Sequence, residues 1–140
     1  DYVGAEDAYR TAIRLDPENA AAHSNLGNLL KNVKKDYVGA EAAYRTAIRL
    51  DPELATPHIC LGNLLNNVKK DHAGAEEAYR TAIRLDPENA EAHFALGILV
   101  GWTKSDWAGA EGAFVRALEL NPAHAQAKKF LPHIRAQLRK

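Results

Sequence analysis

Residues 36–52 read DYVGAEAAYRTAIRLDP, and close copies of this block begin at Asp1, Asp71 and Asp106. The four starting positions, 1, 36, 71 and 106, are separated by 35 residues each time. A constant period of this length is typical of proteins built from stacked structural units that pack mainly against their neighbours. The sequence therefore predicts a repeat array and not a single globular core.

Each repeated block has the pattern of an amphipathic helix. Asp36 stands where an N-cap is expected, because its carboxylate can accept hydrogen bonds from the first turn. Glu41 and Arg45 are four residues apart, a spacing that favours an ion pair on a solvated helix face. Apolar residues recur near the helical period of 3.6 residues, at Ala40, Ala43, Tyr44, Ala47, Ile48 and Leu50.

The segments between the blocks are predicted to form a second helix. Each begins with an acidic or amide residue followed by proline, as in Asp16-Pro17 and Asp51-Pro52. We expect this pair to end the preceding helix and to cap the next one, with proline at its first position. Neither helix is long or apolar enough to be stable alone. Stacked helix pairs, forming an all-α solenoid, are therefore expected.

The spacing of these residues resembles the tetratricopeptide repeat, whose signature is W-x2-L-G-x2-Y, then A-x3-F, then P. The corresponding residues of the first full unit are His23, Leu26, Gly27, Leu30, Ala40, Tyr44 and Pro52. The pattern recurs in two further units, at His58, Leu61, Gly62, Leu65, Ala75, Tyr79 and Pro87, and at His93, Leu96, Gly97, Val100, Ala110, Phe114 and Pro122. Histidine replaces the usual large aromatic residue, and the unit has 35 residues and not 34. We expect the extra residue to widen the turn within each helix pair.

The resemblance implies a right-handed superhelix of antiparallel helix pairs and a division of the chain into five parts. These are the second helix of a truncated repeat (1–17), three full repeats (18–52, 53–87 and 88–122) and a C-terminal capping helix (123–140). On this reading the chain is a fragment of a longer polypeptide. The face left uncovered on the first helix is expected to drive end-to-end self-association through Tyr2, Val3, Tyr9 and Ile13.

The resemblance also implies a concave groove, lined by the first helix of each full repeat. Residues pointing away from the signature positions cannot pack in the same core, so we expect them to face a partner. These candidate peptide-binding residues are Ser24, Asn28, Lys31, Asn32, Ile59, Asn63, Asn66, Asn67, Phe94, Ile98 and Trp102. Asparagine amides suit a peptide backbone, and an aromatic stripe suits an apolar side chain or a helix. The alternative is that the asparagines are only solvated and that Trp102 packs against the capping helix.

Some tetratricopeptide domains hold the C-terminal carboxylates of chaperones with lysine, asparagine and arginine at fixed groove positions. Carried onto this sequence, those positions are Ser24, Asn28, Cys60, Glu91 and Ala95. Only Asn28 has the required side chain, and Glu91 would repel a carboxylate. The resemblance therefore predicts that chaperone tails are not bound in this manner.

Composition and motifs argue against several other functions. A formal net charge of zero argues against nucleic-acid binding, including the single-stranded RNA recognition of pentatricopeptide repeats, which share the period. His23, His58 and His93 recur once per unit, without the paired spacing of a metal site, so we expect them to pack between helices. Neither a catalytic set nor a cofactor motif is present. The absence of a long apolar run argues against a membrane segment, and the single cysteine, Cys60, fits a cytoplasmic location.

The function expected is that of a scaffold that binds a peptide or helix of a partner protein, without enzymatic activity. The alternative is a structural or self-associating segment of a longer array, and RNA binding is a distant third reading. Alanine at Asn28, Asn63 and Phe94 is expected to abolish partner capture without lowering the melting temperature, if the first interpretation is correct.

Overall fold

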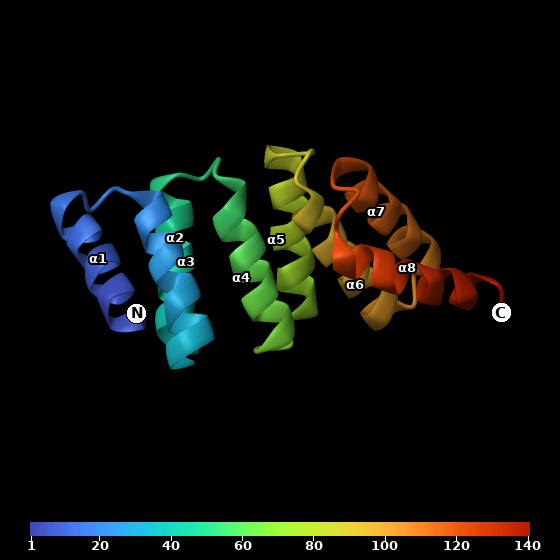
Figure 1. Ribbon diagram of the computed structural model, residues 1–140, viewed down its shortest axis with the longest axis horizontal. Coiled ribbons are helices and arrows are strands. Elements are labelled where there is room, and N and C mark those ends of the chain that lie inside the picture. The colour runs from blue at the N-terminus through green and yellow to red at the C-terminus, as the bar shows by residue number, and fades with distance from the viewer.

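The computed structural model describes residues 1–140 and consists of helices stacked in a row, with the two termini at opposite ends (Figure 1). The repeated blocks form four helices, α1 (Tyr2–Leu15), α3 (Tyr37–Leu50), α5 (His72–Leu85) and α7 (Trp107–Leu120). The intervening segments form α2 (Ala20–Leu29) with its π-helical end η1 (Leu30–Lys34), α4 (Ala55–Asn67), α6 (Ala90–Lys104) and α8 (Ala125–Leu138). The expected all-α solenoid of antiparallel helix pairs is confirmed.

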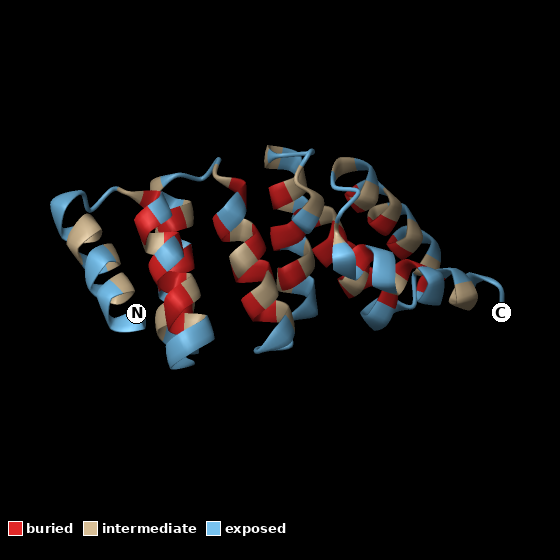
Figure 2. Ribbon diagram, in the orientation of Figure 1, coloured by how far each residue is buried: buried red, intermediate tan, exposed pale blue.

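The core is divided into three clusters of buried residues along the row from α2 to α8, whereas α1 has no buried residue (Figure 2). One aromatic side chain per full repeat is almost completely buried, with exposures of 0%, 1% and 0% for Tyr44, Tyr79 and Phe114. Each ring lies against the signature glycine of the preceding helix, which is Gly62 for Tyr79. The paired helices can therefore approach closely because a glycine, which has no side chain, faces the aromatic ring.

The expected helix caps are confirmed for the repeated blocks and are wrong for the segments between them. Asp36 accepts a hydrogen bond from the Gly39 N–H at 2.9 Å, and Asp71 and Asp106 do the same in their helices. Asp16 does not open α2: its backbone and side chain accept hydrogen bonds from Asn19 and Glu18, which closes a turn. The Asn19 side chain caps α2 instead.

The additional residue of each 35-residue unit is accommodated in the turns where α2, α4 and α6 end. Lys35, Lys70 and Ser105 adopt left-handed backbone conformations, with φ of 57°, 58° and 54°. The next N–H group, that of Asp36 in the first case, donates to the carbonyl six residues earlier. This bond spans one residue more than the usual helix-ending bond, so the predicted wider turn is confirmed.

The repeated histidines each fix the turn that precedes their own helix. The Nε2 atoms of His23, His58 and His93 lie 3.1, 3.3 and 2.9 Å from the carbonyl oxygens of Pro17, Pro52 and Pro87. All three rings are half-buried. Their role is therefore to join a turn to a helix, which is more specific than the packing role expected.

Ion pairs connect successive helices at the edge of the stack. Glu41 forms an ion pair with Arg45 of its own helix, α3, at 2.9 Å. It forms a second ion pair, at 2.8 Å, with Lys69, which follows the end of α4. Glu6 and Glu76 make the equivalent pairs. The hydrogen bond from Lys69 is the largest influence lowering the pKa of Glu41, and Lys34 and Lys104 act likewise on Glu6 and Glu76.

Acid is expected to destabilise the array through these three carboxylates. Because their pKa values are lower in the folded than in the unfolded chain, their stabilising contribution is present above the ordinary glutamate pKa of 4.5. It is lost as the pH falls through the lowered folded values. We expect the melting temperature, followed by circular dichroism, to decrease below that pH. The double variant Glu41→Gln, Glu76→Gln should show a shallower decrease, and an unchanged acid slope in this variant would contradict the assignment.

Candidate peptide-binding groove

The first helices of the full repeats, α2, α4 and α6, lie next to one another and carry the predicted binding residues. Two hollows, of about 230 and 240 Å³, are found along these helices. Both are lined by Lys31, Asn63 and Asn67, so they adjoin one another, and we call the two together the A-helix groove. The structure thus brings together most of the residues predicted from the sequence, namely Lys31, Asn32, Asn63, Asn66, Asn67, Phe94 and Ile98.

Three of the predicted residues are buried, so the expectation that their face is free of packing is wrong. Ser24, Ile59 and Phe94 have exposures of 3%, 6% and 7%. These residues point away from the partner helix of their own pair, but neighbouring helix pairs also pack on each other. Phe94, for example, lies with its ring centroid 5.1 Å from that of Phe114 and 4.6 Å from that of His124. Only a small part of Phe94 reaches the groove, as its floor.

Asn63 of the groove and the equivalent Asn28 also satisfy buried tyrosine hydroxyls. Asn28 does not line the A-helix groove but a separate depression between α1 and α2. The Tyr44 hydroxyl donates to Asn28 Oδ1 at 2.7 Å, and the Tyr79 hydroxyl donates to Asn63 Oδ1 at 2.6 Å. Burial is the main cause that raises the pKa of both tyrosines. The Asn63 amide oxygen is therefore occupied, and its amino group is left to donate into the groove.

The third repeat supports the pairing of tyrosine with asparagine, because both residues of the pair are replaced there. Phe114 has no hydroxyl, and the residue facing it in the position of the asparagine is Ile98. Where no hydroxyl needs an acceptor, no amide is present. The sequence contains this signal, but it is recognised only when both helices of each repeat are compared.

The remaining polar residues of the groove differ in how far they are engaged within the chain. Asn66 Oδ1 lies 2.8 Å from His72 Nδ1, and the Asn66 amino group donates to Asn67 at 3.3 Å. Lys31 is half-buried and makes no ion pair within the chain. The ammonium group of Lys31 and the amino groups of Asn63 and Asn67 are thus the donors available to a ligand.

Cys60 lies beside the groove as a half-buried thiol. Burial raises the pKa of this thiol, opposed first by the nearby charge of Lys31 and then by the side chains of Asn28 and Ser24. The raised pKa favours the neutral thiol. Ser24 Oγ has no hydrogen-bond partner.

Trp102 belongs to an aromatic cluster at the C-terminal end and does not line the groove. Its ring centroid lies 5.5 Å from that of Trp107 and 5.8 Å from those of Phe130 and His133. Of the two readings of Trp102, packing against the capping helix is therefore the one observed. Of the predicted stripe of Phe94, Ile98 and Trp102, only Phe94 and Ile98 line the groove.

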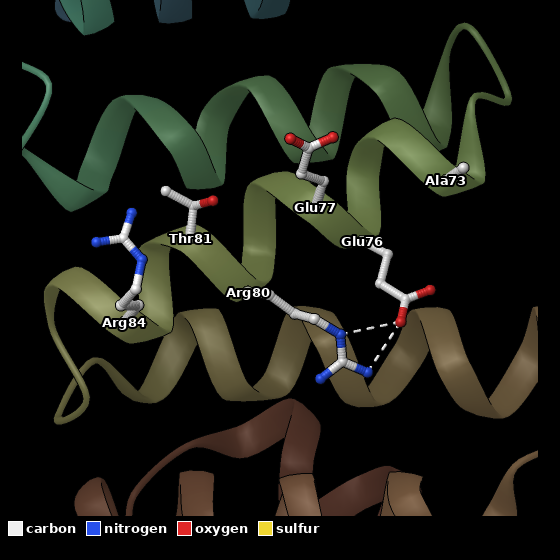
Figure 3. A pocket seen from close by; sticks show the side chains of 6 residues that line it. All are labelled: Ala73, Glu76, Glu77, Arg80, Thr81 and Arg84. Carbon is white, nitrogen blue, oxygen red and sulfur yellow. Dashed lines mark hydrogen bonds and ion pairs between the residues drawn. The ribbon is translucent and has the colours of Figure 1, made fainter.

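A further depression, of about 490 Å³, lies along one face of α5 (Figure 3), which we call the outer side of α5. All of its lining residues come from this one helix, and Ala73 is the only apolar one among them. Glu76 and Arg80 at its edge are paired with each other at 2.8 Å. This surface is formed by one helix, whereas the A-helix groove is formed by several helices.

No group of three or more histidine, cysteine, aspartate or glutamate side chains is arranged to hold a metal ion. None of the helices combines the length and the hydropathy that crossing a bilayer requires.

A row of antiparallel helix pairs with a groove along their first members defines a helical-repeat solenoid. The repeats are of the tetratricopeptide type: the family model described as a TPR repeat matches residues 1–33 and 69–101. None of the curated proteins matches the chain in sequence.

Solved structures with the same fold include other tetratricopeptide proteins. The crystal structure of MamA has 22% sequence identity and a TM-score of 0.78, over 96% of this chain and 77% of that one. The first TPR domain of Spaghetti (RPAP3), bound to the HSP90 peptide SRMEEVD, has 22% identity and a TM-score of 0.80, over 89% and 97%. The Arabidopsis OM64 TPR domain has 23% identity and a TM-score of 0.76, over 85% and 96%. At these identities the likeness establishes the fold alone.

Proposed function

We propose that this chain is a protein-interaction module that holds an extended peptide or a helix of a partner protein in the A-helix groove. The observation that carries the proposal is that the two adjoining hollows of the groove share Lys31, Asn63 and Asn67 and together are lined by residues of three repeats. The HSP90 peptide bound to the RPAP3 domain, which has the same fold, supports a peptide as the class of ligand.

The chemistry of the groove favours a ligand that offers carbonyl or carboxylate oxygens at one end and an apolar side chain at the other. Lys31 and the amino groups of Asn63 and Asn67 can only donate to such oxygens. Tyr79 holds the Asn63 amide in one orientation, so this donor is positioned before the ligand arrives. Ile98 and the exposed edge of Phe94 supply the apolar contact.

The ligand is expected to differ from the chaperone tail seen in the RPAP3 complex. At the positions that grip such tails, this chain has Ser24, which is buried, and Cys60, which carries no positive charge. Glu91 at the same surface adds a negative charge, held by His124 at 3.1 Å. The arrangement lacks the paired cations that a terminal carboxylate needs.

Selection from a displayed random-peptide library, followed by fluorescence anisotropy with the selected peptides, tests the proposal. Lys31→Glu should weaken these peptides at least about tenfold, because hydrogen bonds to a charged group contribute roughly 1.5–3 kcal/mol. Arg84→Glu, a matched charge reversal on the outer side of α5, should leave their affinity unchanged. The peptide SRMEEVD should not bind tightly.

The proposal would be overturned if no peptide were selected, or if Arg84→Glu and not Lys31→Glu reduced binding. Either result would favour a purely structural segment or a different binding surface.

A further inference from the structure

One of the two hollows of the A-helix groove is basic. It has a volume of about 240 Å³ and lies between η1, the start of α3 and the end of α4. We call it the lysine hollow, and its lining residues are Lys31, Asn32, Lys35, Tyr37, Asn63, Asn67 and Val68. No acidic residue is among them, whereas the other hollow of the groove includes the carboxylate of Glu91.

The two lysines of this hollow carry charges that no group of the chain neutralises. Neither Lys31 nor Lys35 forms an ion pair within the chain. The lysines at the ends of the first helices, Lys34, Lys69 and Lys104, in contrast each pair with a glutamate. Like charges that line one hollow repel each other, and a bound anion relieves this repulsion.

Two carboxamides of the lysine hollow have their oxygens occupied within the chain. Asn63 Oδ1 accepts the hydroxyl of Tyr79 at 2.6 Å, and Asn67 Oδ1 accepts the amino group of Asn66 at 3.3 Å. The amino groups of Asn63 and Asn67 are therefore the parts of these side chains that are left for a ligand. Together with two ammonium groups, they favour a ligand that has several negatively charged oxygens.

The lysine hollow is not a consequence of the repeat, because the equivalent residues of the next unit differ. Lys31 corresponds to Asn66, whose Oδ1 lies 2.8 Å from His72 Nδ1. Only Lys35 has a lysine as its counterpart, which is Lys70. The pair of unpaired lysines is thus specific to the contact between the first and second full repeats.

We propose that the lysine hollow binds the phosphate group of a phosphorylated serine or threonine in an extended partner peptide, an inference that rests on the function proposed above. A phosphate monoester carries a charge of about −1.5 to −2 at neutral pH and three acceptor oxygens. This matches two ammonium groups and the amide donors beside them, whereas a carboxylate has a single charge and would compensate only one lysine. Because Lys31 lines both hollows, the flanking peptide can continue over Phe94 and Ile98.

A nucleic acid offers the same phosphate chemistry but fits the charge distribution less well. A strand of RNA or DNA presents a phosphate at every nucleotide and is bound by many cations along its path. The adjoining hollow contains Glu91. Residues 123–140 hold five of the 18 basic residues and none of the 18 acidic ones, so the rest of the chain is net negative. A single phosphate on a peptide is therefore the favoured ligand.

Fluorescently labelled degenerate peptide pools, identical except for a central phosphoserine, serine or glutamate, serve as probes. In anisotropy titrations the phosphoserine pool should bind at least about tenfold more tightly than the serine pool, because hydrogen bonds between charged groups are the strong ones. The glutamate pool should bind more weakly than the phosphoserine pool. The preference for phosphoserine should decrease at high salt, which screens exposed charges.

Lys35→Asn is the test variant, because asparagine tolerates the left-handed conformation of Lys35, with φ of 57°, while the charge is removed. This variant should lose most of the preference for phosphoserine, and Lys31→Gln should do the same. Lys70→Asn is the matched control, at the equivalent left-handed position, with φ of 58°, outside the hollow. It should keep the full preference.

Equal affinities for the phosphoserine and serine pools, or a preference that survives both Lys35→Asn and Lys31→Gln, would overturn the proposal. An equal affinity for the glutamate pool would show that a carboxylate suffices, and tighter binding of a single-stranded RNA homopolymer would identify a nucleic-acid site; either result also overturns it. If unphosphorylated library-selected peptides bind in a Lys31-dependent manner while the pools do not differ, only the phosphate inference fails. If no peptide of any kind binds, the proposed function fails as well.

Discussion

Asn63→Ala is expected to lower the free energy of unfolding by about 1–3 kcal/mol, the usual cost of leaving a buried hydroxyl without a partner. The Tyr79 hydroxyl donates a hydrogen bond to Asn63 Oδ1 at 2.6 Å, and Tyr79 is 1% exposed. Urea unfolding followed by circular dichroism measures this loss. The structure thereby changes the expectation that alanine at Asn28 or Asn63 would leave the melting temperature unaltered.

The third repeat supplies the control for this variant, because it contains the same contact without polar groups. The double variant Tyr79→Phe, Asn63→Ile copies Phe114 and Ile98 and should recover most of the lost stability. If the double variant were as unstable as the sum of the single variants, the hydrogen bond would not be the reason for the asparagine.

Gly62→Ala should destabilise the chain by up to about 2 kcal/mol, although alanine is the better helix former by about 1 kcal/mol. The added Cβ would lie 2.6 Å from Tyr79 Cε1, and overpacking of this kind costs about 1–3 kcal/mol. The same urea titration measures the change. The sign of the effect decides between helix propensity and close packing.

Gly112→Ala is the matched substitution, within α7 and with no atom within 4 Å of the added Cβ. It should raise stability by about 0.5–1 kcal/mol through helix propensity alone. A stabilising Gly62→Ala, or equal effects of the two substitutions, would contradict the role of the signature glycines as contact points for aromatic rings.

Features set by the local sequence could be predicted well. The period of the apolar residues fixes the helix pairs, and the side chain of Asp36 is sufficient to start α3. The additional residue of each unit could be placed in the turn because the blocks on either side of it keep the repeated pattern. The start of α2 was not predicted correctly. Asp16 ends α1 and forms a turn, and the nearby Asn19 is the residue that caps α2.

Features that depend on contacts between repeats could not be derived from one helix at a time. Ser24, Ile59 and Phe94 are buried because neighbouring first helices pack on one another, which a helical wheel does not represent. The ion pair from Lys69 to Glu41 joins residues 28 positions apart. For the candidate site, the sequence identified the lining residues of the groove but not the second role of Asn28 and Asn63.

Mapping of amide chemical shifts by NMR, with a library-selected peptide added to the labelled chain, tests the central claim most directly. The account predicts saturable shifts at Lys31, Asn67 and Ile98, on the three helices that line the A-helix groove. Saturable shifts confined to the outer side of α5, around Glu77 and Arg84, would contradict it.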